Sequence, residues 1–206
     1  MKRTLTFIMF PLFFVVFVFC GSQMDRAKHF NKLARAPEWK PDEVIKTLDI
    51  QKGDFIGDLG SGGGYYTFRF AEETGSEGKV FAADINQEFL KSIELDAKEK
   101  GISNIQTILA KTDDSNFEEN SLDLIFIRNT FHHFDNKNQY IKKLAGKIKK
   151  DGRIAIIDYK KESSSGPFGH NITKEDVLES LKGNGLIIEK EYKFLEKQYF
   201  FILKKK

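Results

Sequence analysis

The stretch "DLGSGGGYYT" at residues 58–67 constrains the fold of this chain more than any other feature. It places four glycines in five positions directly after a short apolar run. Ordering glycine costs more backbone entropy than ordering any other residue, and a tight turn alone needs only one. We therefore expect a loop between a strand and a helix, whose backbone N–H groups approach a ligand.

Strand and helix patterns alternate on both sides of this loop. Apolar runs predict strands at 54–60, 79–84, 104–110, 121–129 and 153–159. Helices are predicted after Pro41 and at 67–75, 86–101, 135–152 and 173–183. Asn86 is an expected N-cap, and Thr173 with Asp176 has the spacing of a capping box. The helix at 135–152 is expected to bury Ile148 and to stop at Asp151-Gly152.

The last two apolar runs, "LIIEKEYKF" and "KQYFFILKK", are separated by only a few residues and predict an antiparallel hairpin. The whole pattern predicts an α/β fold: a Rossmann-like, seven-stranded, mainly parallel sheet with helices on both faces and a C-terminal hairpin. Residues 23–206 are long enough for one domain with a hydrophobic core. The net charge of +3 is too mild for a nucleic-acid-binding protein, so we expect no nucleic-acid partner.

The first 22 residues form a separate segment. Lys2 and Arg3 precede "LTFIMFPLFFVVFVF", an almost unbroken apolar run that ends at Cys20. This pattern is typical of an export signal or a membrane anchor. Three interpretations stay open: a lipoprotein signal that is lipidated at Cys20, a cleaved signal peptide, and an uncleaved anchor. Each predicts membrane association or export, but basic residues flank both ends of the run and leave the side of the membrane undecided.

The glycine spacing distinguishes between cofactors. A dinucleotide fingerprint G-x-G-x-x-G that starts at Gly60 requires glycine at position 65, where this chain has Tyr65. The spacing present is D-x-G-x-G-x-G, and a second strand ends at Asp84. This pattern resembles the class I S-adenosylmethionine-dependent methyltransferases, and in particular their small-molecule, type 11-like members. The stretches that carry the resemblance are "GDFIGDLGSGGGYYTFRFA", "GKVFAADI", "ILAKTDDSNFEENSLDLIFI", "NTFHHF" and "KKDGRIAIIDY".

The resemblance implies a set of residues around S-adenosylmethionine. Gly60, Gly62 and Gly64 would lie under its amino-acid and ribose portions, with Ser61 in the same turn. Asp58 would hold this turn and reach the ammonium group, directly or through water.

The second strand and the turn after the third would complete the cofactor site. Asp84, at a strand end, is placed to accept hydrogen bonds from both ribose hydroxyls. Ile85 resembles the apolar residue that packs on adenine, and Asp113 or Asp114 resembles the acceptor for its amino group. A plain polar turn is the other interpretation of this Asp pair, because Asp and Ser favour turns.

The methyl acceptor is expected beyond the fourth strand, in "RNTFHHF". Asn129 occupies a position that borders the methyl group in related enzymes. His132 or His133 would be a general base if the nucleophile arrives protonated, because imidazole titrates near neutral pH. Simple packing beside phenylalanines is the alternative for either histidine. The loop 160–171, which contains His170, would cover the substrate, and the histidine spacing gives no reason to expect a metal site.

Three functions compete. The first is methyl transfer from S-adenosylmethionine to a small molecule by a membrane-associated or exported protein. The second, a nicotinamide-dependent oxidoreductase, is disfavoured by Tyr65, and none of the six tyrosines has a lysine four residues later. The third is a non-catalytic protein that binds S-adenosylmethionine. Nothing in the sequence chooses among a quinone, a phenol, a thiol or a metalloid as acceptor.

Overall fold

The computed structural model describes residues 25–161 and 171–206. The segment 1–22 with Cys20, and His170 of the expected covering loop, lie outside the described residues.

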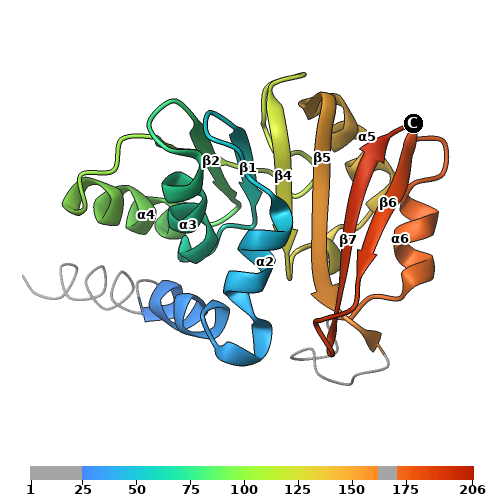
Figure 1. Ribbon diagram of the computed structural model, residues 1–206, viewed down its shortest axis with the longest axis horizontal. Coiled ribbons are helices and arrows are strands. Elements are labelled where there is room, and N and C mark those ends of the chain that lie inside the picture. Colours follow the sequence, from blue (N-terminus) through green and yellow to red (C-terminus); the bar gives the residue numbers. More distant parts are fainter. Residues whose placement is uncertain (1–24, 162–170) are drawn as a thin grey trace, which may run out of the picture.

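Seven strands form one sheet in the order β3-β2-β1-β4-β5-β7-β6 (Figure 1). The strands are β1 (Phe55–Leu59), β2 (Lys79–Asp84), β3 (Ile105–Leu109), β4 (Leu122–Arg128), β5 (Ile148–Tyr159), β6 (Leu186–Tyr192) and β7 (Gln198–Lys205). The first five run parallel to one another, and β7 pairs antiparallel with both β5 and β6. The chain reverses its direction along the sheet between β3 and β4. Ligands bind at such switch points, outside the carboxyl ends of the strands.

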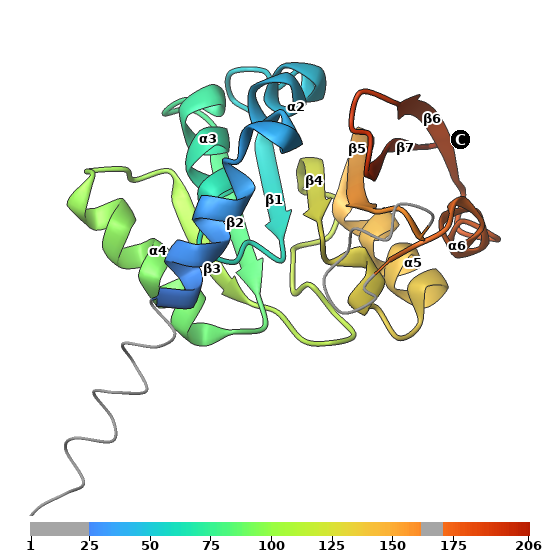
Figure 2. The same cartoon turned by 90° about the horizontal axis from the view of Figure 1, so that it is seen from below.

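Helices cover both faces of the sheet (Figure 2). The elements outside the sheet are a helical stretch at 25–34, η1 (Pro37–Trp39), α2 (Pro41–Leu48), α3 (Tyr65–Thr74), α4 (Gln87–Glu99), η2 (Phe131–His133), α5 (Lys137–Lys147) and α6 (Lys174–Ser180). Apolar side chains of α2 and α3 pack on one face with β1, β4 and β5, and those of α5 and α6 pack on the other. The central strands are therefore buried on both faces, which explains their almost continuous apolar runs.

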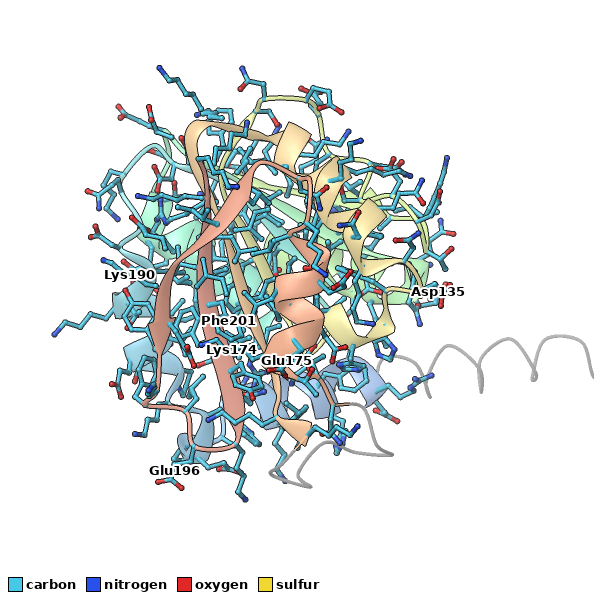
Figure 3. The ribbon with its side chains drawn as sticks, turned by 90° about the vertical axis from the view of Figure 1, so that its right-hand side faces the viewer. Asp135, Lys174, Glu175, Lys190, Glu196 and Phe201 are labelled. Atoms are coloured by element: carbon cyan, nitrogen blue, oxygen red, sulfur yellow. The ribbon has the colours of Figure 1, made fainter. Side chains whose placement is uncertain are left out.

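The predicted fold class is confirmed, and so are several local signals. Asn86 caps α4 through the Glu88 N–H group, and Thr173 and Asp176 form the expected capping box on α6. The C-terminal hairpin is present at the edge of the sheet, where α6 stands beside it (Figure 3). Lys174 at the start of α6 lies over the ring of Phe201 in β7, with 5.9 Å between its ammonium nitrogen and the ring centroid.

The predicted end of the fourth helix, α5, is wrong. The helix stops at Lys147, and Ile148 begins β5 in an extended conformation. Ile148 is fully buried, as expected, but as a strand residue that pairs with Leu122 of β4. The Asp151-Gly152 stop signal therefore lies inside β5, where the pairing register with β4 shifts. Pairing with β4 outweighs the helical periodicity of this stretch.

The helical stretch at 25–34 was not predicted, because its sequence is mostly polar. In the described part of the chain, no helix is both long and apolar enough to cross a membrane.

Candidate active site

The sequence-predicted site residues come together along the carboxyl edge of the sheet. Residues 60–64 connect β1 to α3, Asp84 ends β2 and Ile85 follows it, and 110–114 follow β3. Asn129 and η2 follow β4, next to the end of β5.

The glycines of the loop meet mostly protein atoms. A Cβ atom on Gly60 would lie 2.1 Å from the Thr130 hydroxyl oxygen, and one on Gly64 would lie 2.8 Å from Ile93. Both distances are far below van der Waals contact, so no larger residue fits at either position. Gly60, Gly62 and Gly64 all have positive φ, at 79°, 52° and 86°, which explains the alternating glycine pattern.

The helical stretch at 25–34 closes over this loop. Asn31 donates from its side chain to the carbonyl of Gly63 at 2.7 Å and accepts the Tyr65 N–H at 3.0 Å. A Cβ on Gly63 would lie 2.2 Å from the backbone oxygen of Ala27. Gly63 therefore serves helix packing rather than ligand approach.

This packing corrects the reasoning that four glycines must serve a ligand. Only Gly62 has open space, with its nearest neighbour, Phe30, 3.8 Å from a Cβ placed there. The hydroxyl oxygen of Ser61, next to it, is buried and has no hydrogen-bond partner among the described residues. A buried hydroxyl without a partner costs free energy, so Ser61 and Gly62 mark the part of the loop suited to a ligand.

Asp58 holds the loop from beneath. Its carboxylate is buried and accepts a hydrogen bond from the Thr67 hydroxyl at 2.6 Å, which ties the first turn of α3 to β1. Burial raises its pKa from 3.8 to about 7, against the opposing effect of the Thr67 hydrogen bond.

Asp84 has both carboxylate oxygens engaged by backbone. It accepts the Gly62 N–H at 2.9 Å on one oxygen and the Asn86 N–H at 2.9 Å on the other. Burial raises its pKa, although these amides oppose the shift. Each carboxylate oxygen has two lone pairs, so Asp84 keeps capacity to accept two hydroxyl groups.

Two exposed apolar side chains lie beside Asp84. Ile85 is 64% exposed and Leu109, which pairs with Asp84 across the sheet, is 50% exposed. Exposed large apolar side chains at a sheet edge suit a flat ring. Asp113 and Asp114 follow in the next turn, where Lys143 of α5 lies 3.2 and 3.6 Å from their carboxylates.

Those carboxylates differ in exposure. The Asp113 side chain is 77% exposed, whereas that of Asp114 is 29% exposed and also accepts the Asn116 N–H at 2.9 Å. Burial opposes its ionisation, but this amide and the nearby lysines hold the pKa of Asp114 below its ordinary value. The lowered pKa keeps Asp114 ionised at neutral pH, so that its carboxylate can accept from an amino group.

Asn129 directly follows β4 and has a positive φ of 53°, a conformation that asparagine tolerates better than most residues. Its side-chain oxygen accepts a 2.6 Å hydrogen bond from Gln198, which is fully buried at the start of β7. The sequence predicted the place of Asn129 but not this partner.

His132 and His133 lie in η2, and their partner was missed. The ring Nδ1 of His132 lies 2.8 Å from a carboxylate oxygen of Asp158, the fully buried penultimate residue of β5. The Nε2 atoms of His132 and His133 are 3.0 Å apart. An apolar strand that ends in aspartate had already identified Asp84, and "RIAIIDY" carries the same signal for Asp158.

Trp39 also reaches this end of the sheet. Its ring meets that of Tyr159, the residue after Asp158, edge to face at 5.5 Å. Among the described residues, no cluster of three or more His, Cys, Asp or Glu side chains is placed to hold a metal ion.

Comparison with known proteins gives one family. A family model described as a methyltransferase domain matches residues 50–198. The ubiquinone/menaquinone biosynthesis C-methyltransferase UbiE of Francisella philomiragia is 28% identical over 161 residues, which cover 76% of this chain and 63% of that protein. UbiE of Idiomarina loihiensis is 27% identical over 123 residues, 59% of this chain and 49% of that protein. The chain thus spans less than two thirds of these relatives.

Solved structures share the fold. A SAM-dependent methyltransferase from Aquifex aeolicus superposes with a TM-score of 0.78 at 23% identity, covering 86% of this chain and 95% of that one. Geranyl diphosphate C-methyltransferase from Streptomyces coelicolor, solved with Mg²⁺, geranyl diphosphate and S-adenosyl-L-homocysteine, superposes with a TM-score of 0.67 at 13% identity, covering 80% and 78%.

Proposed function

The chain belongs to the methyltransferase-domain family, and we propose that it transfers a methyl group from S-adenosylmethionine to a small-molecule acceptor. The relatives named as methyltransferases and the shared fold support this activity. The observation that supports this activity most strongly is the hydrogen bond between the glycine loop and Asp84: the Gly62 N–H group donates to the Asp84 carboxylate at 2.9 Å.

The residues present fit this cofactor. Asp84 would accept from the two ribose hydroxyls with the lone pairs that its backbone partners leave available. Ser61, whose buried hydroxyl has no partner in the described chain, would bind the amino-acid portion over Gly62. Gly60 and Gly64 would keep the loop in its conformation, and Asp58 would fix the first turn of α3 beneath it.

The adenine ring would lie on Ile85, whose exposed side chain otherwise costs free energy in water. Asp114 or Asp113 would accept from the adenine amino group, and the Lys143 ion pairs hold both carboxylates in place.

When bound, S-adenosylmethionine supplies a methyl carbon on a sulfonium, and its transfer is an in-line displacement in which the carbon–sulfur bond breaks as the new bond forms. Alignment of the two reactants provides much of the acceleration in such a reaction. Asn129 would border the methyl carbon, as its resemblance to the corresponding residue of related enzymes implies; it directly follows β4, and Gln198 donates a hydrogen bond to its side-chain oxygen.

For residues 1–22 we propose membrane association, as a lipoprotein signal, a signal peptide or an anchor. The basic start and the apolar run support this proposal. Membrane fractionation of cells that express the full chain, or a chain without residues 1–22, tests it. The full chain is expected in the membrane or exported fraction. Recovery of both chains in the cytosol would refute membrane association. Comparing the mass of the wild type with that of the Cys20→Ala variant distinguishes a lipidated from an unlipidated N-terminus.

Transfer of a radiolabelled methyl group from S-adenosylmethionine to a panel of quinols, phenols, thiols and metalloid oxyanions tests the proposed activity. We expect label in one acceptor class with the wild type and about tenfold or more less with Asp84→Ala at limiting cofactor, because the ribose contacts are lost. Incorporation that is unchanged in Asp84→Ala would contradict the proposed site.

A further inference from the structure

We propose that Arg128, the last residue of β4, binds a carboxylate group of the methyl acceptor. This inference rests on the proposed methyl transfer and deepens it, because it names a chemical feature of the acceptor. Arg128 is half-buried between two aromatic side chains: its guanidinium carbon lies 6.0 Å from the ring centroid of Trp39 and 5.5 Å from that of Tyr66.

The strand places Arg128 on the face of the sheet that α2 and α3 cover (Figure 2). Alternate residues of a strand share a face, and Leu124 and Phe126 of β4 belong to the core beneath these helices. Arg128 continues the same row at the carboxyl end of β4. Its neighbour Trp39 also meets Tyr159, the last residue of β5, edge to face at 5.5 Å. Arg128 therefore belongs to the β4–β5 half of the carboxyl edge, where the acceptor is expected.

The guanidinium group has no anionic partner in the described part of the chain. Its contacts there are those with the two aromatic rings, and no hydrogen bond or ion pair joins it to another described residue. Asp58 acts on it only through its charge, since the Asp58 carboxylate is buried and accepts from Thr67. Aromatic rings stabilise a cation but supply no oxygen to its five N–H donors. The site is thus suited to a negatively charged ligand.

The aromatic ring of Tyr66 carries a second donor without a partner. Tyr66 is only 5% exposed, and its hydroxyl oxygen is buried with no hydrogen-bond partner among the described residues. Burial raises its pKa to about 12, against the opposing effect of the Arg128 charge, so the hydroxyl keeps its hydrogen at neutral pH. A buried donor without an acceptor costs free energy. Both observations therefore indicate a ligand that accepts hydrogen bonds.

A carboxylate is the anion that fits these donors best. Its two oxygens match the fork of a guanidinium group and leave lone pairs for the Tyr66 hydroxyl. A doubly charged phosphate fits less well, because Asp58, with a pKa of about 7, is partly ionised at neutral pH and repels a second negative charge. Trp39 and Tyr159 are half-buried and offer ring surface for the apolar body of an acid.

The amino-acid portion of S-adenosylmethionine is the other source of a carboxylate in this reaction. Ser61 already offers a buried hydroxyl for that portion in the glycine loop. Arg128, by contrast, contacts Trp39, which leads to Tyr159 at the end of β5. The acceptor is therefore the source that the structure favours, and the experiments below distinguish it from the cofactor.

The first test uses the fluorescence of Trp39, the single tryptophan of the chain. The full chain, saturated with S-adenosylhomocysteine, is titrated at constant ionic strength with acetate, benzoate and 3-phenylpropionate, and with the three corresponding neutral amides. We expect a saturable change with at least one acid, bound about tenfold or more tightly than its amide, because charge-assisted hydrogen bonds are lost in the amide. If no acid binds more tightly than its amide, the proposal is overturned.

Substitution of Arg128 tests the residue itself. Arg128→Gln should weaken binding of the acid about tenfold or more and leave binding of the amide unchanged, whereas Arg128→Lys, which keeps the charge without the fork, should fall between. The matched control is Arg69→Gln in α3, because Arg69 is already paired with Asp42 at 2.8 Å. An equal loss in Arg69→Gln and Arg128→Gln would contradict a specific site.

Tyr66→Phe separates ligand binding from a purely structural role. It removes a hydroxyl that has no partner in the described chain, so the free energy of unfolding should not fall. Binding of the acid should nevertheless weaken about threefold or more. Wild-type affinity for the acid in Arg128→Gln would overturn the site. Should that variant not fold, wild-type affinity in both Arg128→Lys and Tyr66→Phe would do so.

Calorimetry with two nucleosides identifies the source of the carboxylate. S-adenosylhomocysteine carries the amino-acid carboxylate, and 5′-methylthioadenosine lacks it. The acceptor assignment predicts that Arg128→Gln binds both as the wild type does. A loss of about tenfold or more for S-adenosylhomocysteine alone would assign the carboxylate to the cofactor and overturn the proposal. If the folded wild type binds neither nucleoside, the proposed function itself fails.

Discussion

The two halves of the carboxyl edge of the sheet are held together by different kinds of contact. At β1 and β2, most contacts involve backbone groups: the N–H of Gly62 donates to Asp84, and glycines allow the close approach of the helical stretch at 25–34. At β4 and β5, side chains meet side chains: Asp158 holds His132, and Gln198 holds Asn129. A backbone-built site demands glycine at fixed positions, whereas a side-chain site leaves no such spacing.

Two strand-end aspartates, Asp84 and Asp158, make the comparison specific. Each lies at the carboxyl end of an apolar strand, and each accepts two backbone N–H groups. Asp84 retains some exposure and lies beside the exposed Ile85, whereas Asp158 is fully buried under an imidazole. The same sequence signal thus gives one carboxylate suited to a ligand and one suited to a histidine.

Replacement of these two aspartates should have the most divergent effects. Asp84→Ala should weaken S-adenosylmethionine binding by about one to three orders of magnitude, because two hydrogen bonds to a charged group are lost at ~1.5–3 kcal/mol each. Asp158→Asn should leave the dissociation constant within about threefold, because its partners are protein groups. Titration calorimetry of both variants checks this. Equal losses of affinity in the two variants would contradict this division and show that both aspartates contribute to cofactor binding.

Asp58 should make the stability of the protein depend on pH. Because burial raises its pKa from 3.8 to about 7, the folded protein binds this proton more tightly than the unfolded chain. The free energy of unfolding therefore falls as the pH rises through this window and levels off above it. Asp58→Asn keeps an acceptor for Thr67 and removes the loss, which is on the order of 4 kcal/mol at most. Urea unfolding at pH 5 and pH 8 should show a flatter profile for the variant, and parallel profiles would contradict this.

Gly63→Ala should destabilise the β1 half by about 1–3 kcal/mol, because its Cβ would strike the backbone of the 25–34 helix. The matched control is Gly146→Ala in α5, where a Cβ meets only the mobile end of Glu119. That change should stabilise the protein by about 0.5–1 kcal/mol, since alanine is the better helix former. Urea unfolding measures both, and a neutral Gly63→Ala would show that the helical stretch yields easily.

The smallest effect is expected at Gln198 in the β4–β5 half. Gln198→Leu loses the hydrogen bond to Asn129 but also removes a buried side-chain oxygen without a partner in the described chain. These contributions oppose each other, so the free energy of unfolding should change by about 1 kcal/mol or less. A larger loss in thermal or urea unfolding would show that Gln198 supports the whole edge.

Features that local residues determine could be predicted from the sequence, and features that depend on distant contacts could not. The strands, caps and hairpin belong to the first group, as Asn86 at the start of α4 illustrates. The end of α5 belongs to the second, since Ile148 takes its conformation from pairing with Leu122 of β4. Asn31 and Asp158 were missed because their roles arise from contacts 32 and 26 residues away in the sequence. A single sequence carries no periodic signal for such contacts.

Titration calorimetry of the full chain with S-adenosylmethionine, with NADH in parallel, tests the central claim most directly. The account predicts binding with a dissociation constant of about micromolar magnitude, its loss in Asp84→Ala, and no heat from NADH. If the folded protein gives no heat with S-adenosylmethionine, or binds NADH instead, the glycine loop serves another ligand and the methyltransferase proposal is contradicted.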